Sequence, residues 1–266
     1  MKHAGDALAG LCLVIFGLGA LPAPAAAAAG LDLQSGALRI SVTPIADAIL
    51  RVRVAAGAQF PEDASWVVPA EVRHASVSVQ DWSDEQAAGF RTALLAVRVE
   101  RATLRLVVSD LDGKVISADV PADVPGGAIE SQGAAFTLRK MIPEAEHYFG
   151  MGDKTGPLDR RGQAFVDWNT DAYRFQESTD PLYKSVPFFV ASGGPGGSYG
   201  IYLDNTWRSW FDFGKRDPQA LAFGAAGGPI DYYLIYGPSL RRVVERFTSL
   251  SGRPPLPPLW SLGFQQ

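Results

Sequence analysis

The sequence predicts an all-β protein, a β-sandwich of antiparallel strands. Apolar residues recur at every second position in residues 38–42, 50–54 and 95–99, and most of the residues between them are polar. A period of two is typical of strands that bury one face. No segment with a helical period interrupts residues 31–108, and Pro61, Pro69, Pro121 and Pro125 mark loops between the predicted strands. Many short strands with regular turns favour a sandwich.

Residues 1–29 differ from the rest of the chain and predict a secretory signal peptide. Lys2 precedes an apolar run at residues 8–21, and an alanine tract ends at Ala29. A basic start, an apolar core and a small-residue exit are typical of such signals, and the run is shorter than the about 20 residues of a membrane span. We expect export to the periplasm or the medium, with no membrane span after cleavage. An N-terminal anchor or a disordered tail is the alternative.

Charge and cysteine content exclude several classes of partner. Lysine and arginine number 24 against 28 aspartate and glutamate, a net charge of −4 that argues against a nucleic-acid partner. Cys12, the only cysteine, lies inside the predicted signal, which leaves no disulfide or cysteine metal site. His74 and His147 have no partner at metal-ligand spacing. We therefore expect no metal and no cofactor.

Residues 106–235 continue the strand pattern. Asp112 and Gly113 separate two apolar runs, which is a strong signal for a hairpin. Further strands are predicted at 136–139, 186–190, 200–203 and 230–235. The glycine-rich run 192–197 joins two of them. It reads as a flexible hairpin connection rather than a phosphate loop, because no helix with a lysine and a serine follows it.

One helix is predicted, from Leu240 to Leu250. Pro238 and Ser239 supply a start signal, apolar residues follow at helical spacing, and Gly252 supplies a stop. The three arginines on the opposite face indicate a solvated surface, with a binding patch as the alternative. The prolines at 254–258 predict a stiff linker. Residues 259–266 then read as the start of an apolar strand without a partner, so we expect a truncated chain.

Several motifs, in order, resemble glycoside hydrolase family 31, the α-glucosidases and their relatives. They are Phe-Gly-Met-Gly-Asp-Lys-Thr-Gly at 149–156, Trp-Asn-Thr-Asp at 168–171 and Tyr-Lys-Ser-Val-Pro-Phe-Phe at 183–189. The segment 252–265 is similar to that family's passage into its catalytic barrel. The match covers residues 135–266 well, and residues 31–134 match only in general β-rich character.

The resemblance implies a domain plan. A galactose-mutarotase-like β-sandwich would occupy residues 30–237, a linking helix and Pro-rich linker residues 238–258, and the first strand of a truncated (β/α)₈ barrel residues 259–266. The family's catalytic nucleophile and acid/base are aspartates on later barrel strands. None of them is assigned to this chain, so we expect the chain alone to be inactive.

The resemblance also implies a substrate-binding loop, because a loop of the family's sandwich reaches over the barrel mouth. Asp171 would accept hydrogen bonds from sugar hydroxyls, and a charged acceptor strengthens such bonds. Trp168 or Tyr173 would supply an apolar face to a pyranose ring. The alternatives are that Asp171 caps a turn and that Trp168 belongs to the core.

Two neighbouring charged motifs have structural interpretations. Asp153 and Lys154 suggest a turn with an internal ion pair, and residues 159–161, Asp-Arg-Arg, suggest a solvated charge cluster. The sequence therefore favours the N-terminal part of an exported retaining enzyme that acts on α-linked oligosaccharides, with its catalytic barrel as intramolecular partner. A non-catalytic carbohydrate-binding module is the alternative, and an independent mutarotase-like enzyme is a weaker third.

Overall fold

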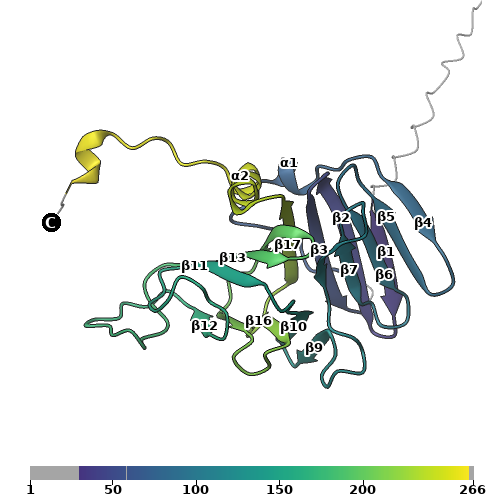
Figure 1. Ribbon diagram of the computed structural model, residues 1–266, viewed down its shortest axis with the longest axis horizontal. Helices are drawn as coiled ribbons and strands as arrows, with labels where there is room; N and C mark the ends of the chain where they lie inside the picture. The colour runs from purple at the N-terminus through teal and green to yellow at the C-terminus, as the bar shows by residue number, and fades with distance from the viewer. Residues whose placement is uncertain (1–29, 58, 264–266) are drawn as a thin grey trace, which may run out of the picture.

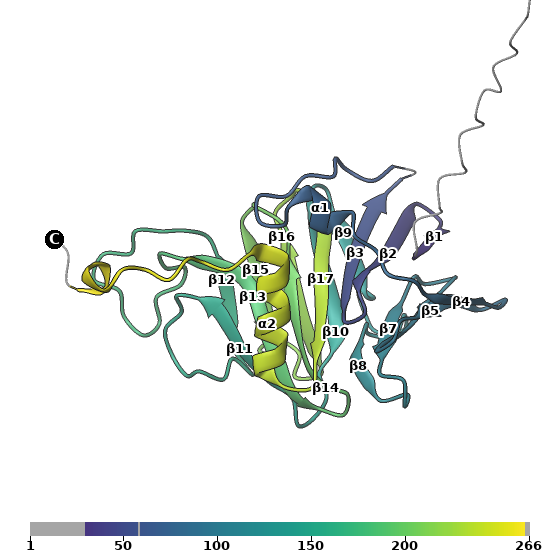
Figure 2. The same ribbon diagram turned by 90° about the horizontal axis from the view of Figure 1, so that it is seen from above.

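The computed structural model describes residues 30–57 and 59–263, so the predicted signal peptide at 1–29 lies outside the described residues. The chain folds into three antiparallel sheets, which confirms the all-β prediction (Figure 1 and Figure 2). A four-residue helix, α1 (Ala70–Arg73), lies within the region where only strands were expected. No helix of the described residues is long and apolar enough to cross a membrane.

The first sheet has seven strands and forms the centre of the molecule. Its order is β1 (Leu31–Ser35), β2 (Leu38–Ala46), β3 (Ile49–Ala56), β17 (Ile230–Gly237), β14 (Gly197–Leu203), β13 (Ser185–Gly194) and β11 (His147–Gly152). Strands β13 and β14 pair directly through the glycine-rich connection, so the hairpin predicted there is confirmed.

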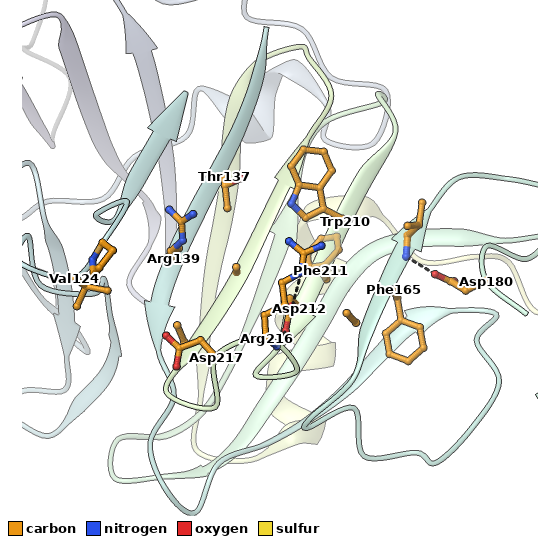
Figure 3. A pocket seen from close by; sticks show the side chains of 15 residues that line it. Val124, Thr137, Arg139, Phe165, Asp180, Trp210, Phe211, Asp212, Arg216 and Asp217 are labelled. Atoms are coloured by element: carbon orange, nitrogen blue, oxygen red, sulfur yellow. Dashed lines mark hydrogen bonds and ion pairs between the residues drawn. The ribbon is translucent and has the colours of Figure 1, made fainter. Parts of the chain in front are cut away.

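The second sheet has five strands. Its order is β12 (Ala164–Asp167), β15 (Ser209–Phe213), β16 (Ala220–Ala225), β10 (Ala135–Met141) and β9 (Ile129–Gln132). Phe211, Phe213 and Phe223 are fully buried on the face toward the first sheet. Trp210, Asp212 and residues of the neighbouring strands line the opposite, outer face (Figure 3).

The third sheet also has five strands, and it carries the predicted hairpin. Its order is β4 (Gln80–Ser83), β5 (Ala87–Arg91), β6 (Ala96–Glu100), β7 (Leu106–Ser109) and β8 (Val115–Ala118). Strands β7 and β8 pair across Asp112 and Gly113, as predicted. Gly113 has a φ of 82°, a conformation that glycine adopts without steric cost.

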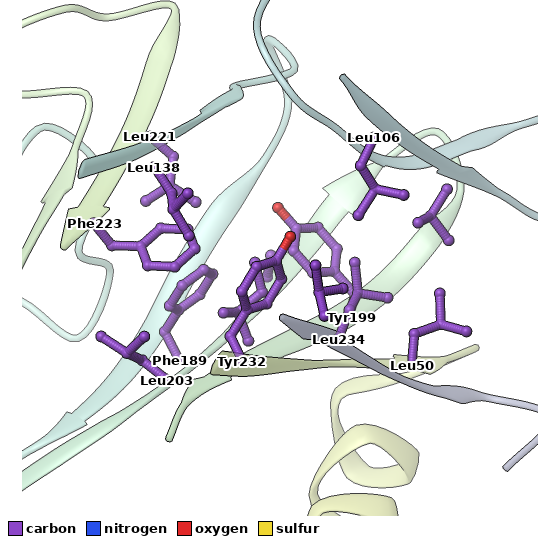
Figure 4. Packing of buried hydrophobic residues seen from close by; sticks show 14 of the residues in the cluster. Leu50, Leu106, Leu138, Phe189, Tyr199, Leu203, Leu221, Phe223, Tyr232 and Leu234 are labelled. Atoms are coloured by element: carbon purple, nitrogen blue, oxygen red, sulfur yellow. The ribbon is translucent and has the colours of Figure 1, made fainter. Parts of the chain in front are cut away.

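All three sheets contribute to one hydrophobic core. Leu50 of the first sheet, Leu106 of the third and Phe223 of the second belong to the same buried cluster (Figure 4). Phe189 lies near its centre, with ring centroids 5.2 Å from Phe213 and 5.8 Å from Tyr148. The alternating apolar residues therefore bury a shared interior, as a sandwich requires.

The predicted helix is confirmed as α2 (Leu240–Ser251), which packs on the outer face of the first sheet. The Ser239 hydroxyl accepts a hydrogen bond from the backbone N–H of Arg242, the usual role of an N-cap residue. Phe247 stacks on Phe188, with ring centroids 3.9 Å apart. Arg241 and Arg242 pair with Glu245 on the solvent side, as expected for a solvated face.

The strand expected from residue 259 is not present in the described residues. Leu259–Leu262 instead form a 3-10 helix whose Leu259 and Trp260 are largely exposed, and residues 264–266 lie outside the described part. A strand is stabilised by hydrogen bonds to a neighbouring strand, and none of the described strands pairs with this segment. The apolar pattern alone therefore did not produce a strand.

A carboxyl group is buried within the core. Glu146 is 1% exposed, and its Oε1 accepts hydrogen bonds from the hydroxyls of Tyr148 at 2.5 Å and Tyr199 at 3.0 Å. Burial raises the pKa of Glu146 to about 7, although the two hydroxyls and Arg161 oppose the shift. The folded protein therefore holds a proton on this carboxyl in a pH range where the unfolded chain releases it.

This difference predicts a pH dependence of stability. The folded state binds more protons between the ordinary glutamate pKa of 4.5 and about 7, so the free energy of unfolding should fall as pH rises through that range. The loss should reach up to about 3 kcal/mol. Urea unfolding at both ends of the range, on the chain and on Glu146→Gln, measures it. The free energy of unfolding of Glu146→Gln should fall distinctly less over this pH range. Equal losses in the two proteins would show that Glu146 does not cause the pH dependence.

Candidate functional site

The loop that joins β12 to β13, residues 168–184, carries all three predicted sugar contacts. Figure 1 and Figure 2 show long loops beside β11 and β12 that project toward the same end of the molecule as the C-terminal segment. Most side chains of loop 168–184 are exposed, including Asp171 and Tyr173. A loop of this length without secondary structure is typically functional.

Lys154 ties the two ends of this loop together. Its side chain is 2% exposed, and its Nζ donates to the carbonyl of Val166 at 2.6 Å and to Asp180 Oδ1 at 2.9 Å. It also lies 3.1 Å from Asp167 Oδ1, whose side chain is 2% exposed as well. Asp180 completes the base by accepting the backbone N–H of Val166 at 2.6 Å.

Burial shifts the pKa of one carboxyl group at the base of the loop. It raises the pKa of Asp167 to about 6, against the nearby ammonium of Lys154, which lowers it, while Asp180 raises it slightly further. Two carboxylates thus share one buried ammonium. Asp167 precedes residues 168–179 and Asp180 follows them. The lysine therefore holds this segment in place by electrostatics and hydrogen bonds.

The loop is braced further along its length. The backbone N–H of Thr170 donates to the carbonyl of Leu182 at 3.0 Å, and that of Ser185 donates to Asn169 Oδ1 at 2.8 Å. The Thr155 hydroxyl donates to the Glu177 carbonyl. The loop is therefore a defined structure that presents its outward side chains in fixed positions.

A hollow of about 400 Å³ lies beside the loop, and we call it the Trp168 hollow. It is lined by Val67, Asp167, Trp168, Asn169, Ser185, Pro187, Tyr202, Asn205, Thr206, Trp207 and Ser209. Two exposed indoles beside amide and hydroxyl groups suit a sugar, whose ring has an apolar face and a polar edge. The Ser185 hydroxyl is buried and has no hydrogen-bond partner among the described residues.

Trp207 is held in this hollow by its own loop. Its backbone N–H donates to Asn205 Oδ1 at 2.7 Å, and Asn205 Nδ2 donates to the carbonyls of Gly227 and Pro229. The indole lies against Gly228, where an added Cβ would be 2.6 Å from its Cδ1. Trp207 was not predicted as a site residue, although an aromatic residue four positions after the strand predicted at 200–203 was an available signal.

The structure separates the three predicted site residues. Trp168 is 48% exposed and lines the hollow, so its alternative interpretation as a core residue is wrong. Asp171 is exposed beside the Tyr183 hydroxyl, whose pKa is raised first by burial and then by that carboxylate. Tyr173 is 80% exposed and does not line the hollow.

Both neighbouring charged motifs differ from their predictions. Lys154 turns inward to Asp167 and Asp180, and Asp153 instead lies 3.6 Å from Lys184. The predicted internal ion pair is therefore wrong, because each side chain pairs with a residue that lies far away in the sequence.

The solvated charge cluster predicted at 159–161 is also wrong. Arg160 is 5% exposed, and its Nη1 donates to the carbonyls of Thr155 and Pro157. Asp159 pairs with His147 at 2.6 Å. Among residues 30–57 and 59–263, no group of three or more His, Cys, Asp or Glu side chains is placed to hold a metal ion.

Comparison with known proteins finds one family that this chain resembles. Residues 39–212 match the model of the glycosyl hydrolase 31 N-terminal galactose mutarotase-like domain. The chain is 39% identical over 183 residues to Alpha-glucosidase 2 of Bacillus thermoamyloliquefaciens, covering 68% of this chain and 22% of the relative. It is 34% identical over 118 residues to Alpha-xylosidase XylQ of Lactiplantibacillus pentosus, covering 44% of this chain and 15% of that protein.

Solved structures agree with these sequence matches. The GH31 dextranase of Flavobacterium johnsoniae, solved in complex with isomaltotriose, superposes with a TM-score of 0.78 at 28% identity. The match covers 86% of this chain and 27% of the dextranase. The matches thus span between 15% and 27% of the length of these relatives.

Proposed function

The chain belongs to glycoside hydrolase family 31, as its N-terminal galactose mutarotase-like domain, and from this premise we propose that loop 168–184 borders the sugar-binding subsites of an α-glucosidase-like or α-xylosidase-like enzyme. The substrate would be an α-linked oligosaccharide. The intramolecular partner would be a catalytic barrel, which supplies the two catalytic aspartates. Export, inferred from residues 1–29, is part of the same proposal.

The observation that carries the proposal is the buried base of the loop. Lys154 and Asp167 are costly to bury, and their pairing with each other and with the more exposed Asp180 fixes a segment whose exposed side chains have no role in the described core. The desolvation cost of these charges at the base of the loop is explained if the segment must hold Trp168 and Asp171 in fixed positions. A binding site requires that precision, since misplaced contacts lose affinity and rate.

Within this site, Trp168 and Asp171 have different roles. Trp168 and Trp207 offer uncharged, apolar faces at the Trp168 hollow, which would contact the apolar face of a sugar ring. Asp171 is exposed beside Tyr183 and can accept hydrogen bonds from two sugar hydroxyls. We assign no proton-transfer or nucleophilic role to Asp171, because in this family those roles belong to the barrel.

Asp171→Ala tests the subsite role. The enzyme would be a chimaera in which this chain replaces the matching part of the Bacillus α-glucosidase. Loss of a charged hydrogen bond to substrate should cost about 1.5–3 kcal/mol, so kcat/KM for a disaccharide should fall by more than about tenfold. Steady-state kinetics on maltose and isomaltose measure the change.

The matched control is Asp123→Ala, which removes an exposed carboxylate that does not line the Trp168 hollow. It should leave kcat/KM within about twofold of the unmodified chimaera. If Asp171→Ala behaves like this control, Asp171 does not contact the substrate. If the unmodified chimaera binds sugar but lacks turnover, a non-catalytic carbohydrate-binding module becomes the better description.

A further inference from the structure

The outer face of the second sheet has a hollow that the proposed subsite does not use. The strand register places two rows of side chains across β12, β15, β16 and β10. One row is Ala164, Asp212, Ala222 and Arg139, and the other is Val166, Trp210, Gly224 and Thr137. Ala222 and Gly224, the β16 members of the two rows, are small and leave space between the larger side chains of β15 and β10.

This space, the Trp210 hollow, has a volume of about 370 Å³, within the range of small-molecule sites. Figure 3 shows Trp210 above Asp212 and Arg216, with Thr137 and Arg139 on one side and Phe165 and Asp180 on the other. The Trp210 indole lies against Gly224, where an added Cβ would be 2.9 Å from its Cζ2. Glycine at this position therefore lets the ring lie close to the sheet as a platform.

Asp212 is the best-buried polar group in the hollow. It is 6% exposed, and its Oδ1 accepts the backbone N–H groups of Lys215 at 2.6 Å and Arg216 at 3.3 Å. Its Oδ2 is buried and has no hydrogen-bond partner among the described residues, although Arg216 Nε lies 3.6 Å away. Buried acceptors in folded proteins almost always have a donor, so this oxygen indicates a ligand that donates one.

The charges around the hollow favour a neutral ligand. Asp180, Asp212 and Asp217 face Arg139 and Arg216, so neither an anion nor a cation meets a field of one sign. Arg139 is further fixed by Glu130 and by the carbonyls of Gly126 and Gly127, which makes it a rigid wall. A neutral ligand that offers a hydroxyl to Asp212 and an apolar face to an indole is a sugar.

We propose that the Trp210 hollow is a second glycan-binding site, which takes a short neutral oligosaccharide. One pyranose ring packs against Trp210, and one of its hydroxyls donates to Asp212 Oδ2. The site lies on the sheet face, with Asp180 as its contribution from loop 168–184, and it does not depend on the subsite role proposed for that loop. It would hold a longer glucan on the surface of the protein.

The purified chain is titrated with maltotetraose and, separately, with isomaltotetraose. Binding is followed by the indole N–H signals in NMR spectra, with the Trp210 signal assigned from Trp210→Phe. We expect the Trp210 signal to shift, with a dissociation constant on the order of 1 mM. Trp210→Ala should weaken binding by at least about tenfold. Ala222→Leu, which fills the hollow and removes no partner, should abolish binding.

One tryptophan variant serves as the control. Trp66→Ala removes an indole that is 92% exposed and does not line the hollow, and it should leave the titration unchanged. Thermal unfolding shows whether each variant is folded. If folded Trp210→Ala and Ala222→Leu both bind like the unmodified chain, or if neither sugar binds, the second site is overturned.

Trp168→Ala separates the two proposals. If it abolishes binding while Trp210→Ala and Ala222→Leu do not, the sugar binds at the Trp168 hollow, and the Trp210 site is overturned while the proposed function stands. If the Trp210 hollow variants alone lose binding, the second site is supported. The subsite proposal is then judged separately by the kinetics of Asp171→Ala in the chimaera.

Discussion

Replacing Lys154 with methionine is expected to lower the free energy of unfolding by about 3–5 kcal/mol. The side chain is 2% exposed, and its Nζ lies within 3.1 Å of Asp167 Oδ1 and within 2.9 Å of Asp180 Oδ1. Methionine has a similar length and fills the same space, but it leaves two carboxylates without their shared cation. Asp167 is then a buried, unpaired carboxyl, which is among the costliest changes a core can undergo.

Urea unfolding measures this loss, and trypsin measures its local effect. Arg174 is exposed in the middle of the loop, and cleavage after it should become faster once the base no longer holds the loop. Lys114→Met, at an exposed hairpin position, is the matched control and should change stability by less than about 0.5 kcal/mol.

A double-mutant cycle connects the loss to the proposed pairing. In the Asp167→Asn background, Lys154→Met should cost less than it does alone, because the unpaired charge is already absent. Equal costs in both backgrounds, or a loss below about 1 kcal/mol for the single variant, would show that Lys154 does not anchor the loop through these carboxylates.

Phe189→Ala should be comparably damaging, with a loss of about 3–5 kcal/mol. Phe189 has no exposed surface, and its ring meets Tyr148, Tyr199, Phe211 and Phe213 at centroid distances of 5.2–6.4 Å. Figure 4 shows it within the cluster to which all three sheets contribute. Removing the ring therefore leaves a cavity where the sheets meet, which the surrounding strands cannot close.

Equilibrium unfolding in guanidinium chloride measures this second effect. Phe175→Ala is the matched control, because Phe175 is 53% exposed on the loop, and its removal should cost well under about 1 kcal/mol. A Phe189→Ala variant as stable as the control would mean that the sheets do not pack around this ring in solution.

Alternation predicted several of the strands, but β12, β15 and β16 of the second sheet were not among them. Val97 and Val99 are buried while Arg98 between them is only partly so, as period two requires. The hairpin at Asp112 and Gly113 and the helix after Ser239 also follow from local signals, since turns and caps depend on neighbouring residues. Residues 259–262 show where prediction from the apolar pattern fails, because an apolar segment becomes a strand only beside a neighbouring strand.

Charged residues were predicted less well, because their partners lie far away in sequence. Lys140 shares its face of β10 with Phe136 and Leu138, and it is buried against Asp119 and Tyr232. Arg51 alternates with apolar residues as a solvent-facing residue would, yet it is 5% exposed and pairs with Asp231. Lys140 therefore lies on the apolar face of its strand, whereas Arg51 lies on a face that the segment with Asp63 covers. The local pattern shows neither contact.

Local sequence signals were sufficient to predict the fold class, helix α2 and the position of the motif that we propose to contact sugar, because strand period, capping and motif order are local properties. How that motif is held and what lies beside it depend on the tertiary structure. Lys154 meets Asp180 across 26 residues, and Trp207 reaches the Trp168 hollow from the loop after β14. The register of β12, β15, β16 and β10 likewise creates the Trp210 hollow. Burial and pairing between distant segments set these features, and no local pattern records them.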